Sequence, residues 1–192
     1  DGGAADGWKH ESQAGAVVVT GNTETTTLNF GSATLYEFTR NVVKLSGSYL
    51  YQKSGEILSA KSWSLGLRYD RNLTDFHTIF LGETVEGDRF KGIDQRYNTD
   101  IGTKLVFLKD ETLNWLGEVG YRYTLENAIT ISRSLHYARV YSEVEKKWSA
   151  TLSSKYWLEF LPNFTESSDW QANTELSFSV VLTSIFSVKS AY

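Results

Sequence analysis

The chain has 192 residues, a formal net charge of −4, 41% hydrophobic residues and no cysteine. Without cysteine it can form neither a disulfide nor a thiolate metal site, and its dispersed, slightly acidic charge argues against a nucleic-acid partner. No stretch approaches the roughly 18 consecutive apolar residues that a membrane-spanning helix needs, so a helical membrane protein is excluded.

Apolar and polar residues alternate along most of the chain, which is the pattern of β-strands with two unlike faces. In residues 95–108, for example, Tyr97 and Ile101 alternate with Arg96 and Asp100. The pattern predicts an all-β fold whose strands have about ten residues, the length that a tilted strand needs to cross a membrane. In chain order the predicted strands are 11–20, 25–36, 42–53, 61–70, 76–86, 95–108, 113–124, 131–145, 150–160, 170–180 and 185–192.

The connections between these strands are of two kinds. Longer or more polar ones are expected at 52–56, 86–94, 125–130 and 162–169, and tight turns at 37–41, 70–75, 109–112, 146–148 and 182–184. Such alternation is typical of transmembrane barrels. We therefore predict one antiparallel up-and-down transmembrane β-barrel over residues 1–192, with residues 1–8 as a flexible N-terminal segment. Because bacterial barrels usually have an even number of strands, we expect about twelve, of which about eleven are evident in this chain.

Three motifs follow one another along the predicted strands and hairpins: residues 21–25 (GNTET), 67–74 (LRYDRNLT) and 88–97 (DRFKGIDQRY). Over nearly its whole length the chain resembles a domain-of-unknown-function family of Gram-negative outer-membrane proteins that carries the label salt-induced outer membrane protein. The resemblance implies the barrel and an envelope location, but no substrate or reaction. We expect the protein in the outer membrane of a Gram-negative bacterium after removal of a signal peptide, since the chain contains no methionine.

The polar face of the predicted strands carries charges of both signs, which can pair across neighbouring strands. Two interpretations stay open: a closed structural lumen filled by these pairs, or a narrow channel for small hydrophilic or charged solutes. The number of strands does not decide between them, because twelve is intermediate between the about eight strands of barrels filled by side chains and the about sixteen or more strands of open porins. The charged residues expected in the lumen are Glu11, Lys44, Arg68, Asp70, Arg96, Asp100, Lys104, Glu118, Arg122, Arg139, Glu143, Lys155, Glu159, Glu175 and Lys189.

The apolar face is expected to contact lipid, with aromatic side chains near the membrane–water interface. Outer-membrane lipid is therefore the expected partner, and we expect a monomer or a small homo-oligomer. The alternative is a soluble all-β ligand-binding protein whose apolar face points inward. The residues expected to face lipid or the interface are Trp63, Tyr69, Tyr97, Trp115, Tyr121, Tyr123, Tyr156, Trp170 and Phe178.

The sequence favours neither catalysis nor metal binding. Among the histidines His10, His77 and His136, the last falls on one strand face with Ser134, as an outer-membrane phospholipase-like enzyme would require. Strand residues two apart stand about 7 Å from each other, which predicts no direct hydrogen bond. We therefore expect no enzyme, catalytic residue, metal or cofactor. Segment 87–94 is expected to be an ion-paired loop and not a calcium site, because Arg and Lys lie among its carboxylates.

Overall fold

The computed structural model describes residues 7–19, 24–128, 131–181 and 187–191, the last of these by their backbone. Within these residues the fold is all-β, and each predicted strand segment contains a strand, which confirms the prediction. The strands are β1 (Gly7–Val19), β2 (Thr25–Phe38), β3 (Asn41–Ser54), β4 (Ile57–Asn72), β5 (His77–Asp88), β6 (Ile93–Lys109), β7 (Leu113–Ala128), β8 (Ser132–Lys147), β9 (Leu152–Leu161), β10 (Gln171–Val181) and β11 (Ser187–Ala191).

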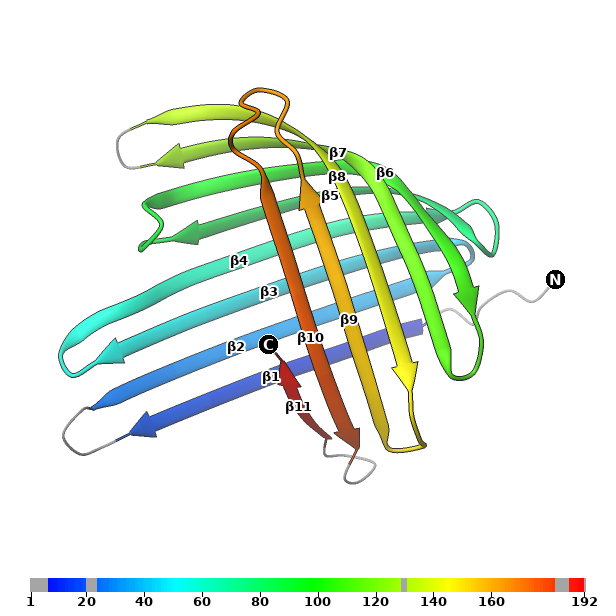
Figure 1. The fold of residues 1–192 in the computed structure, drawn as a ribbon, viewed down its shortest axis with the longest axis horizontal. Helices are drawn as coiled ribbons and strands as arrows, with labels where there is room; N and C mark the ends of the chain where they lie inside the picture. The colour runs from blue at the N-terminus through cyan, green and yellow to red at the C-terminus, as the bar shows by residue number, and fades with distance from the viewer. Residues whose placement is uncertain (1–6, 20–23, 129–130, 182–186, 192) are drawn as a thin grey trace. The chain divides into compact units, whose positions relative to one another are not determined.

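The strands follow their sequence order in an eleven-stranded sheet, so each strand lies beside the one that precedes it in the chain. The pairings β1·β2, β2·β3 and β3·β4 are antiparallel, as are β8·β9, β9·β10 and β10·β11. Figure 1 shows neighbouring strands running in opposite directions. The predicted antiparallel up-and-down topology is therefore confirmed. Among the described residues, no helix is long and apolar enough to cross a membrane.

The chain divides into two compact units. Unit 1 comprises Asp1–Arg71, Phe80–Asp100 and Tyr123–Leu135, and unit 2 comprises Asn72–Ile79, Ile101–Arg122 and His136–Tyr192. Strands β4 to β8 each contribute residues to both units, because the division crosses these strands. The single domain over residues 1–192 stays a prediction.

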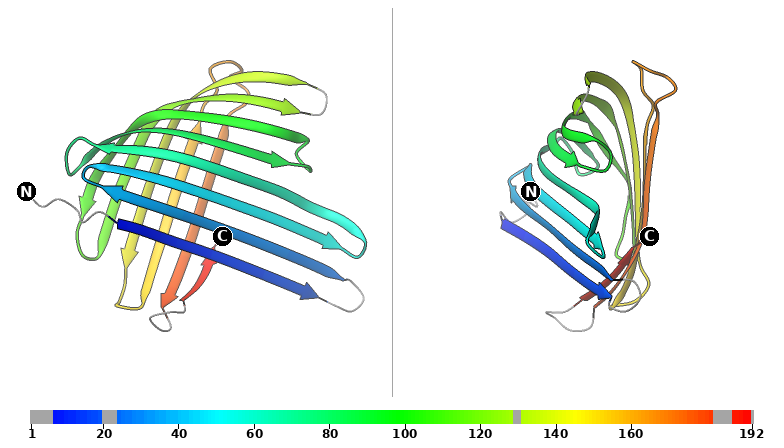
Figure 2. Two further views of the ribbon diagram at one scale, coloured as in Figure 1. Left: turned by 180° about the vertical axis from the view of Figure 1, so that it is seen from behind. Right: turned by 90° about the vertical axis from the view of Figure 1, so that its left-hand side faces the viewer.

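Strands β1 to β3 and residues 57–71 of β4 belong to unit 1, and Figure 2 shows these four strands side by side from two directions. Strand β3 pairs with β4 down to Ser54 and Ile57, so only Gly55 and Glu56 connect them. The longer loop predicted at 52–56 is therefore wrong. Gly55 has a φ of 58°, which a glycine adopts without steric cost, and this allows a two-residue turn.

Two further sequence predictions need correction at strand ends. Strand β7 continues to Ala128, whose N–H donates to the Ile131 carbonyl at 2.9 Å, so the connection predicted at 125–130 is shorter. The flexible segment predicted at 1–8 is wrong for Gly7 and Trp8, which begin β1; the Trp8 ring packs on Tyr36 with centroids 4.6 Å apart. Residues 1–6, 129–130 and the turn predicted at 182–184 lie outside the described residues.

Strand β4 shows how polarity and burial are related. Leu65 and Leu67 on one face expose 53% and 54% of their surface, whereas Asp70 on the opposite face exposes 8%. We term these the apolar face and the polar face, and apply the terms to the residues in register on neighbouring strands. The apolar face is thus the exposed one, which is the reverse of an ordinary soluble core.

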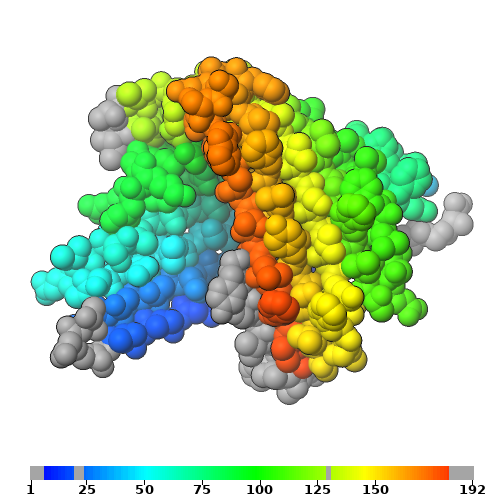
Figure 3. Space-filling model, viewed as in Figure 1, coloured from blue at the N-terminus to red at the C-terminus, as the bar shows by residue number. Residues whose placement is uncertain are grey.

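Buried apolar side chains are correspondingly few among the described residues. In the view of Figure 3 atoms of β9 and β10 lie at the surface, and on these strands Tyr156, Phe160 and Phe178 are exposed. The buried large apolar side chains are Phe80, Ile93 and Leu135 in unit 1 and Tyr137 and Leu161 in unit 2. Polar contacts therefore account for much of the packing on the polar face.

Candidate functional site

Arg96 of β6 is the centre of an ion-paired cluster in unit 1. Its Nη1 lies 3.0 Å from Oε1 of Glu86 on β5, and its Nε donates to Oε2 of Glu126 on β7 at 2.7 Å. Nε of Arg133 on β8 lies 3.0 Å from the other oxygen of Glu126. These four side chains, the Arg96 cluster, contain two guanidinium groups and two carboxylates, so their charges balance.

Neutral hydrogen bonds extend the Arg96 cluster. The Asn98 amide donates to Oε1 of Glu86 at 3.4 Å, and the Thr124 hydroxyl donates to Oδ1 of Asn98 at 2.7 Å. Asn98, Thr124 and Glu126 are all buried. A carboxylate removed from water needs compensating hydrogen bonds as well as an opposite charge. For the buried Glu126 this compensation comes from Arg96 and Arg133, whereas the Asn98 amide bonds the more exposed Glu86 and the Thr124 hydroxyl bonds Asn98.

Arg139 of β8 is the centre of a second cluster, in unit 2. Its Nη1 lies 2.6 Å from Oε2 of Glu118 on β7, and its Nε lies 2.6 Å from Oε1 of Glu159 on β9. Nη2 of Arg122 lies 3.4 Å from the same Glu159 oxygen, and the Asn173 amide donates to the other one at 3.1 Å. The charges of this Arg139 cluster, formed by Arg122, Arg139, Glu118 and Glu159, balance as well.

A further ion pair lies beside the Arg139 cluster. Nζ of Lys155 on β9 lies 2.8 Å from Oε2 of Glu143 on β8, and the Tyr141 hydroxyl donates to the same carboxylate. The Arg139 guanidinium lies 5.3 Å from the centroid of the Tyr141 ring. Tyr141 thus links the two groups of charges by a hydrogen bond on one side and a cation–π contact on the other.

Arg68 and Asp70 form an ion pair along one strand of unit 1. Nε of Arg68 lies 2.6 Å from Oδ1 of Asp70, and the guanidinium lies over the Phe80 ring at 4.0 Å from its centroid. Phe80 is buried, so its ring shields the pair from water. A planar guanidinium suits both contacts because it can stack and donate at once.

The clusters leave their buried polar atoms satisfied. In the described part of the chain, every buried side-chain nitrogen or oxygen has a hydrogen-bond partner. A fully satisfied network fixes rotamers, and an arginine that binds two carboxylates is held in one position. The arrangement can therefore define a rigid polar surface. Within the same residues, no group of three or more His, Asp or Glu side chains could hold a metal ion.

Most of the charged residues predicted from sequence take part in these ion pairs. The structure also places Lys44 of β3 on the polar face, where it lies opposite Arg68 of β4. Glu11 of β1 is on the same face, because its register continues through Ala33 of β2 and Ser46 of β3 to Gly66 of β4. Asp100, Lys104 and Glu175 are half-buried. The side chain of Lys189 lies outside the described residues. The predicted residues that the ion pairs bring together are Arg68, Asp70, Arg96, Glu118, Arg122, Arg139, Glu143, Lys155 and Glu159.

Sequence reasoning missed three members of the Arg96 cluster. Glu126 lies beyond residue 124, where the seventh strand was predicted to end, although it continues the polar alternation of Glu118 and Arg122. Glu86 ends a segment with mixed polarity on both faces. Arg133 shares its parity with Arg139 on β8 and could have been found by extending that alternation.

The aromatic residues predicted to face lipid lie mostly on the exposed surface. Two of them form hydrogen bonds to neighbouring strands: Trp115 Nε1 donates to Oγ of Ser142 at 3.1 Å, and the Tyr69 hydroxyl donates to Oδ1 of Asn41 at 2.7 Å. Tyr97 and Tyr123 are half-buried. The exposed members are Trp63, Tyr69, Trp115, Tyr121, Tyr156, Trp170 and Phe178.

One histidine corrects the sequence argument about residues two apart. Oγ of Ser12 lies 2.8 Å from Nε2 of His10, and Nδ1 of His10 lies 2.7 Å from Oγ1 of Thr34 on β2. Side chains lean along a strand, so a pair two residues apart can bond although the two backbone positions stand about 7 Å apart. In the pair Ser134 and His136, which was singled out from the sequence, the His136 ring forms a hydrogen bond with the Tyr121 hydroxyl. The absence of catalysis stays a prediction.

The loop from β5 to β6 has the predicted ion pair. Nζ of Lys91 lies 3.7 Å from Oδ2 of Asp88, and Oδ1 of Asp88 accepts from the backbone N–H of Phe90 at 3.0 Å. The ion pair predicted in segment 87–94 is therefore confirmed. The connection is shorter than the predicted 86–94, because β5 continues to Asp88 and β6 begins at Ile93, so that residues 89–92 connect the two strands.

A family model described as "Protein of unknown function, DUF481" matches residues 12–192. The chain belongs to this family. The match spans residues of both units of the DUF481 chain and includes both ion-paired clusters. No curated protein matches the DUF481 chain significantly. The predicted membership of a family of unknown function is thus confirmed, whereas the label salt-induced outer membrane protein stays a prediction.

Proposed function

We propose that this chain is an outer-membrane protein of a Gram-negative envelope, whose strands cross the bilayer as a β-barrel with the apolar face toward lipid. The exposed apolar face carries the proposal. Leu65, Leu67 and Val119 expose more than half of their surface, whereas soluble monomers rarely expose apolar patches larger than a few hundred Å². Hydrocarbon chains can cover these side chains without a second protein layer.

The strand lengths support the same proposal. Strands β4, β7 and β8 have 16 residues each, and about 9–11 residues of a tilted strand cross the hydrocarbon core. The remaining residues reach the headgroup regions. Exposed aromatic side chains such as Trp63 and Trp170 suit those regions, because an indole combines an apolar ring with a polar N–H.

We infer further that the polar face lines a narrow lumen for small hydrophilic or charged solutes. The Arg96 cluster and the Arg139 cluster support a narrow lumen, because their side chains reach across neighbouring strands and hold one another in place. Their balanced charges predict little preference between anions and cations. A closed barrel with a structural role in the envelope is the other outcome of a conductance measurement.

The membrane location is tested by removing detergent. The full chain, purified in dodecyl maltoside, is diluted below the critical micelle concentration and followed by circular dichroism and size-exclusion chromatography. We expect aggregation or loss of the folded monomer, because the apolar face loses its cover. A folded, monodisperse monomer without detergent contradicts the proposal and favours the soluble ligand-binding alternative.

The lumen is tested by conductance in planar lipid bilayers. We expect a small conductance, with a reversal potential near zero in a potassium chloride gradient. Arg139→Gln removes one cation beside Glu118 and Glu159, so it is expected to shift the channel toward cations. The matched control, Arg139→Gln with Glu118→Gln, removes one charge of each sign and should shift it less. Wild-type protein that gives no conductance above leak, across salts and voltages, overturns the channel and leaves the closed barrel.

A further inference from the structure

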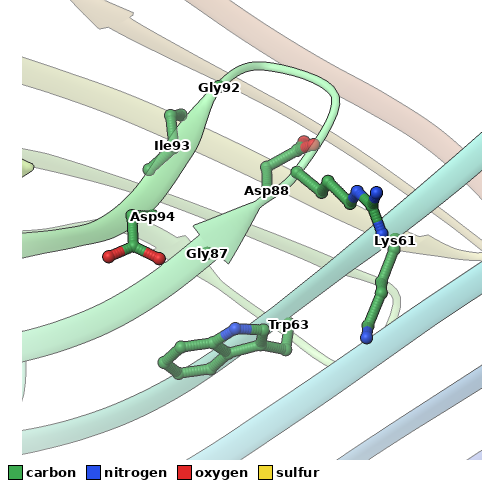
Figure 4. A pocket seen from close by; sticks show the side chains of 8 residues that line it. Lys61, Trp63, Gly87, Asp88, Gly92, Ile93 and Asp94 are labelled. Carbon is green, nitrogen blue, oxygen red and sulfur yellow. The ribbon is translucent and has the colours of Figure 1, made fainter. Parts of the chain in front are cut away.

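A cavity of about 230 Å³ lies where β4, β5 and β6 meet the loop from β5 to β6, all within unit 1. It is lined by two cations, Lys61 and Arg89, by the Trp63 indole, by the backbone of Gly87, and by the carboxylates Asp88 and Asp94. Figure 4 shows Lys61 and Trp63 together on one wall and Asp94 on another. The cavity shares no residue with the Arg96 cluster.

Backbone hydrogen bonding brings the two cations together. The Arg89 N–H donates to the Lys61 carbonyl at 3.1 Å, so the loop after β5 is held against β4. A Cβ at Gly87 would come within 2.5 Å of Nε1 of Trp63 and 3.0 Å of the Asp94 carbonyl. Glycine at this position therefore lets the indole lie directly on the backbone of β5 and form a wall of the cavity.

The charges around the cavity favour an anion on its β4 side. Asp88 accepts backbone hydrogen bonds from Phe90 and Lys91 and pairs with the Lys91 ammonium. Lys61 and Arg89, by contrast, form no ion pair with the carboxylates of the described residues. Asp94 lies on β6, across the cavity from Lys61 (Figure 4). Two cations thus share one side of the cavity, and no carboxylate in the described part of the chain is ion-paired with either of them.

The cavity lies at the end of the exposed apolar face. Trp63 has the same parity on β4 as Leu65 and Leu67, and Lys61 follows them toward the start of the strand. An apolar band that ends in an indole and then in cations is the arrangement found at a membrane–water interface. Phosphate groups are the anions that lipids present at that depth, and guanidinium and ammonium groups bind phosphate strongly.

We propose that Lys61, Arg89 and Trp63 form a binding site for a phosphate group, carried by the headgroup of a lipid in the surrounding leaflet. Arg89 and Lys61 bind the phosphate oxygens, and the Trp63 indole packs against the adjoining part of the headgroup. The inference rests on the proposed membrane location, because only a chain in a bilayer meets such headgroups along this face.

The test measures retention of one defined lipid by the full chain in dodecyl maltoside. Native mass spectrometry counts bound bisphosphorylated lipid A, and the same lipid with its phosphates removed is the reference. The double variant Lys61→Gln/Arg89→Gln is expected to weaken binding of the phosphorylated lipid at least fivefold, and to leave the reference unchanged. Lys53→Gln is the matched control, because Lys53 lies on the neighbouring strand β3 and does not line the cavity.

Several outcomes are distinguishable. Equal lipid retention by the wild type and the double variant, or an equal loss of retention in Lys53→Gln, overturns the site. Competition by 10 mM inorganic phosphate supports the phosphate chemistry but assigns it to the free anion, whereas retention in its presence assigns it to the lipid headgroup. The folding of each variant is checked by circular dichroism. If the double variant retains as much lipid as the wild type while the protein still requires detergent to stay folded, the phosphate site alone is contradicted. If the protein stays folded without detergent, the proposed function is contradicted.

Discussion

Arg139 and Glu118 form an ion pair with 2.6 Å between Nη1 and Oε2, and their side chains expose only 10% and 5% of their surface. A pair so removed from water is costly to break, because the remaining charge stays buried without its partner. The same guanidinium also binds Glu159, so one substitution removes a cation from beside two carboxylates, although Arg122 still lies 3.4 Å from Glu159.

Arg139→Gln is accordingly expected to lower the free energy of unfolding by about 3–5 kcal/mol. Guanidinium unfolding in detergent, followed by tryptophan fluorescence, measures the effect. Lys9→Gln is the control, because Lys9 pairs with Glu37 at 3.4 Å while its side chain is 77% exposed, and exposed pairs contribute about 0–1 kcal/mol. Equal losses in the two variants would contradict the distinction drawn between buried and exposed pairs.

The loss of unfolding free energy in Leu65→Arg shows whether the apolar face contacts lipid or water. Leu65 lies near the middle of β4 and is 53% exposed. Arginine at the bilayer midplane costs about 2–4 kcal/mol, whereas on a surface in water it is close to neutral. We expect the larger loss, measured by denaturant unfolding in phospholipid vesicles. Leu65→Ile is the control for packing, and an unchanged midpoint in Leu65→Arg would contradict the lipid-facing assignment.

Gly120→Ala tests a close approach between β6 and β7. A Cβ at Gly120 would lie 2.5 Å from the Ile101 carbonyl oxygen and 3.1 Å from Cα of Gly102. Because backbone atoms cannot move aside cheaply, we expect a loss of about 1–3 kcal/mol in unfolding free energy. Gly47→Ala is the control, since its Cβ would meet the Ser64 carbonyl at 3.7 Å, an ordinary separation. If Gly47→Ala loses stability and Gly120→Ala does not, the close approach of β6 and β7 at Gly120 is contradicted.

Asp110 makes the turn between β6 and β7 sensitive to pH. Its Oδ1 accepts hydrogen bonds from the backbone N–H groups of Thr112 and Leu113, both at 2.7 Å, and these bonds lower the pKa of the carboxyl. Because the pKa is lower in the folded state than in the unfolded state, the carboxylate stabilises the fold above the ordinary carboxyl pKa. That contribution is lost as the pH falls through the folded-state pKa.

Asp110→Ala is therefore expected to have a lower denaturant midpoint than the wild type at neutral pH and the same midpoint near about pH 2. Glu111→Ala, which removes the neighbouring carboxylate, is the control and should track the wild type at both pH values. A difference between wild type and Asp110→Ala that persists unchanged in acid would show that the carboxylate charge is not the cause.

Alternation along the sequence was sufficient to predict the strands and the two faces. In residues 95–108, Arg96 and Asp100 share one parity and Tyr97 and Ile101 the other, because successive strand side chains point to opposite faces. Strand ends were less predictable. Leu125–Ala128 extended β7, and Gly55 closed a hairpin in two residues, because pairing with a neighbouring strand outweighs the local preference of polar residues for loops.

The sequence by itself determined which residues share a face, since a period of two follows from strand geometry alone. Which charges meet was decided only by the tertiary structure. Arg96 pairs with Glu86 and Glu126, which lie 10 and 30 residues away in the chain, because the register between strands sets their separation. The same register placed Arg89 beside Lys61 and the Trp63 indole on Gly87, an arrangement that no periodicity within a single strand encodes.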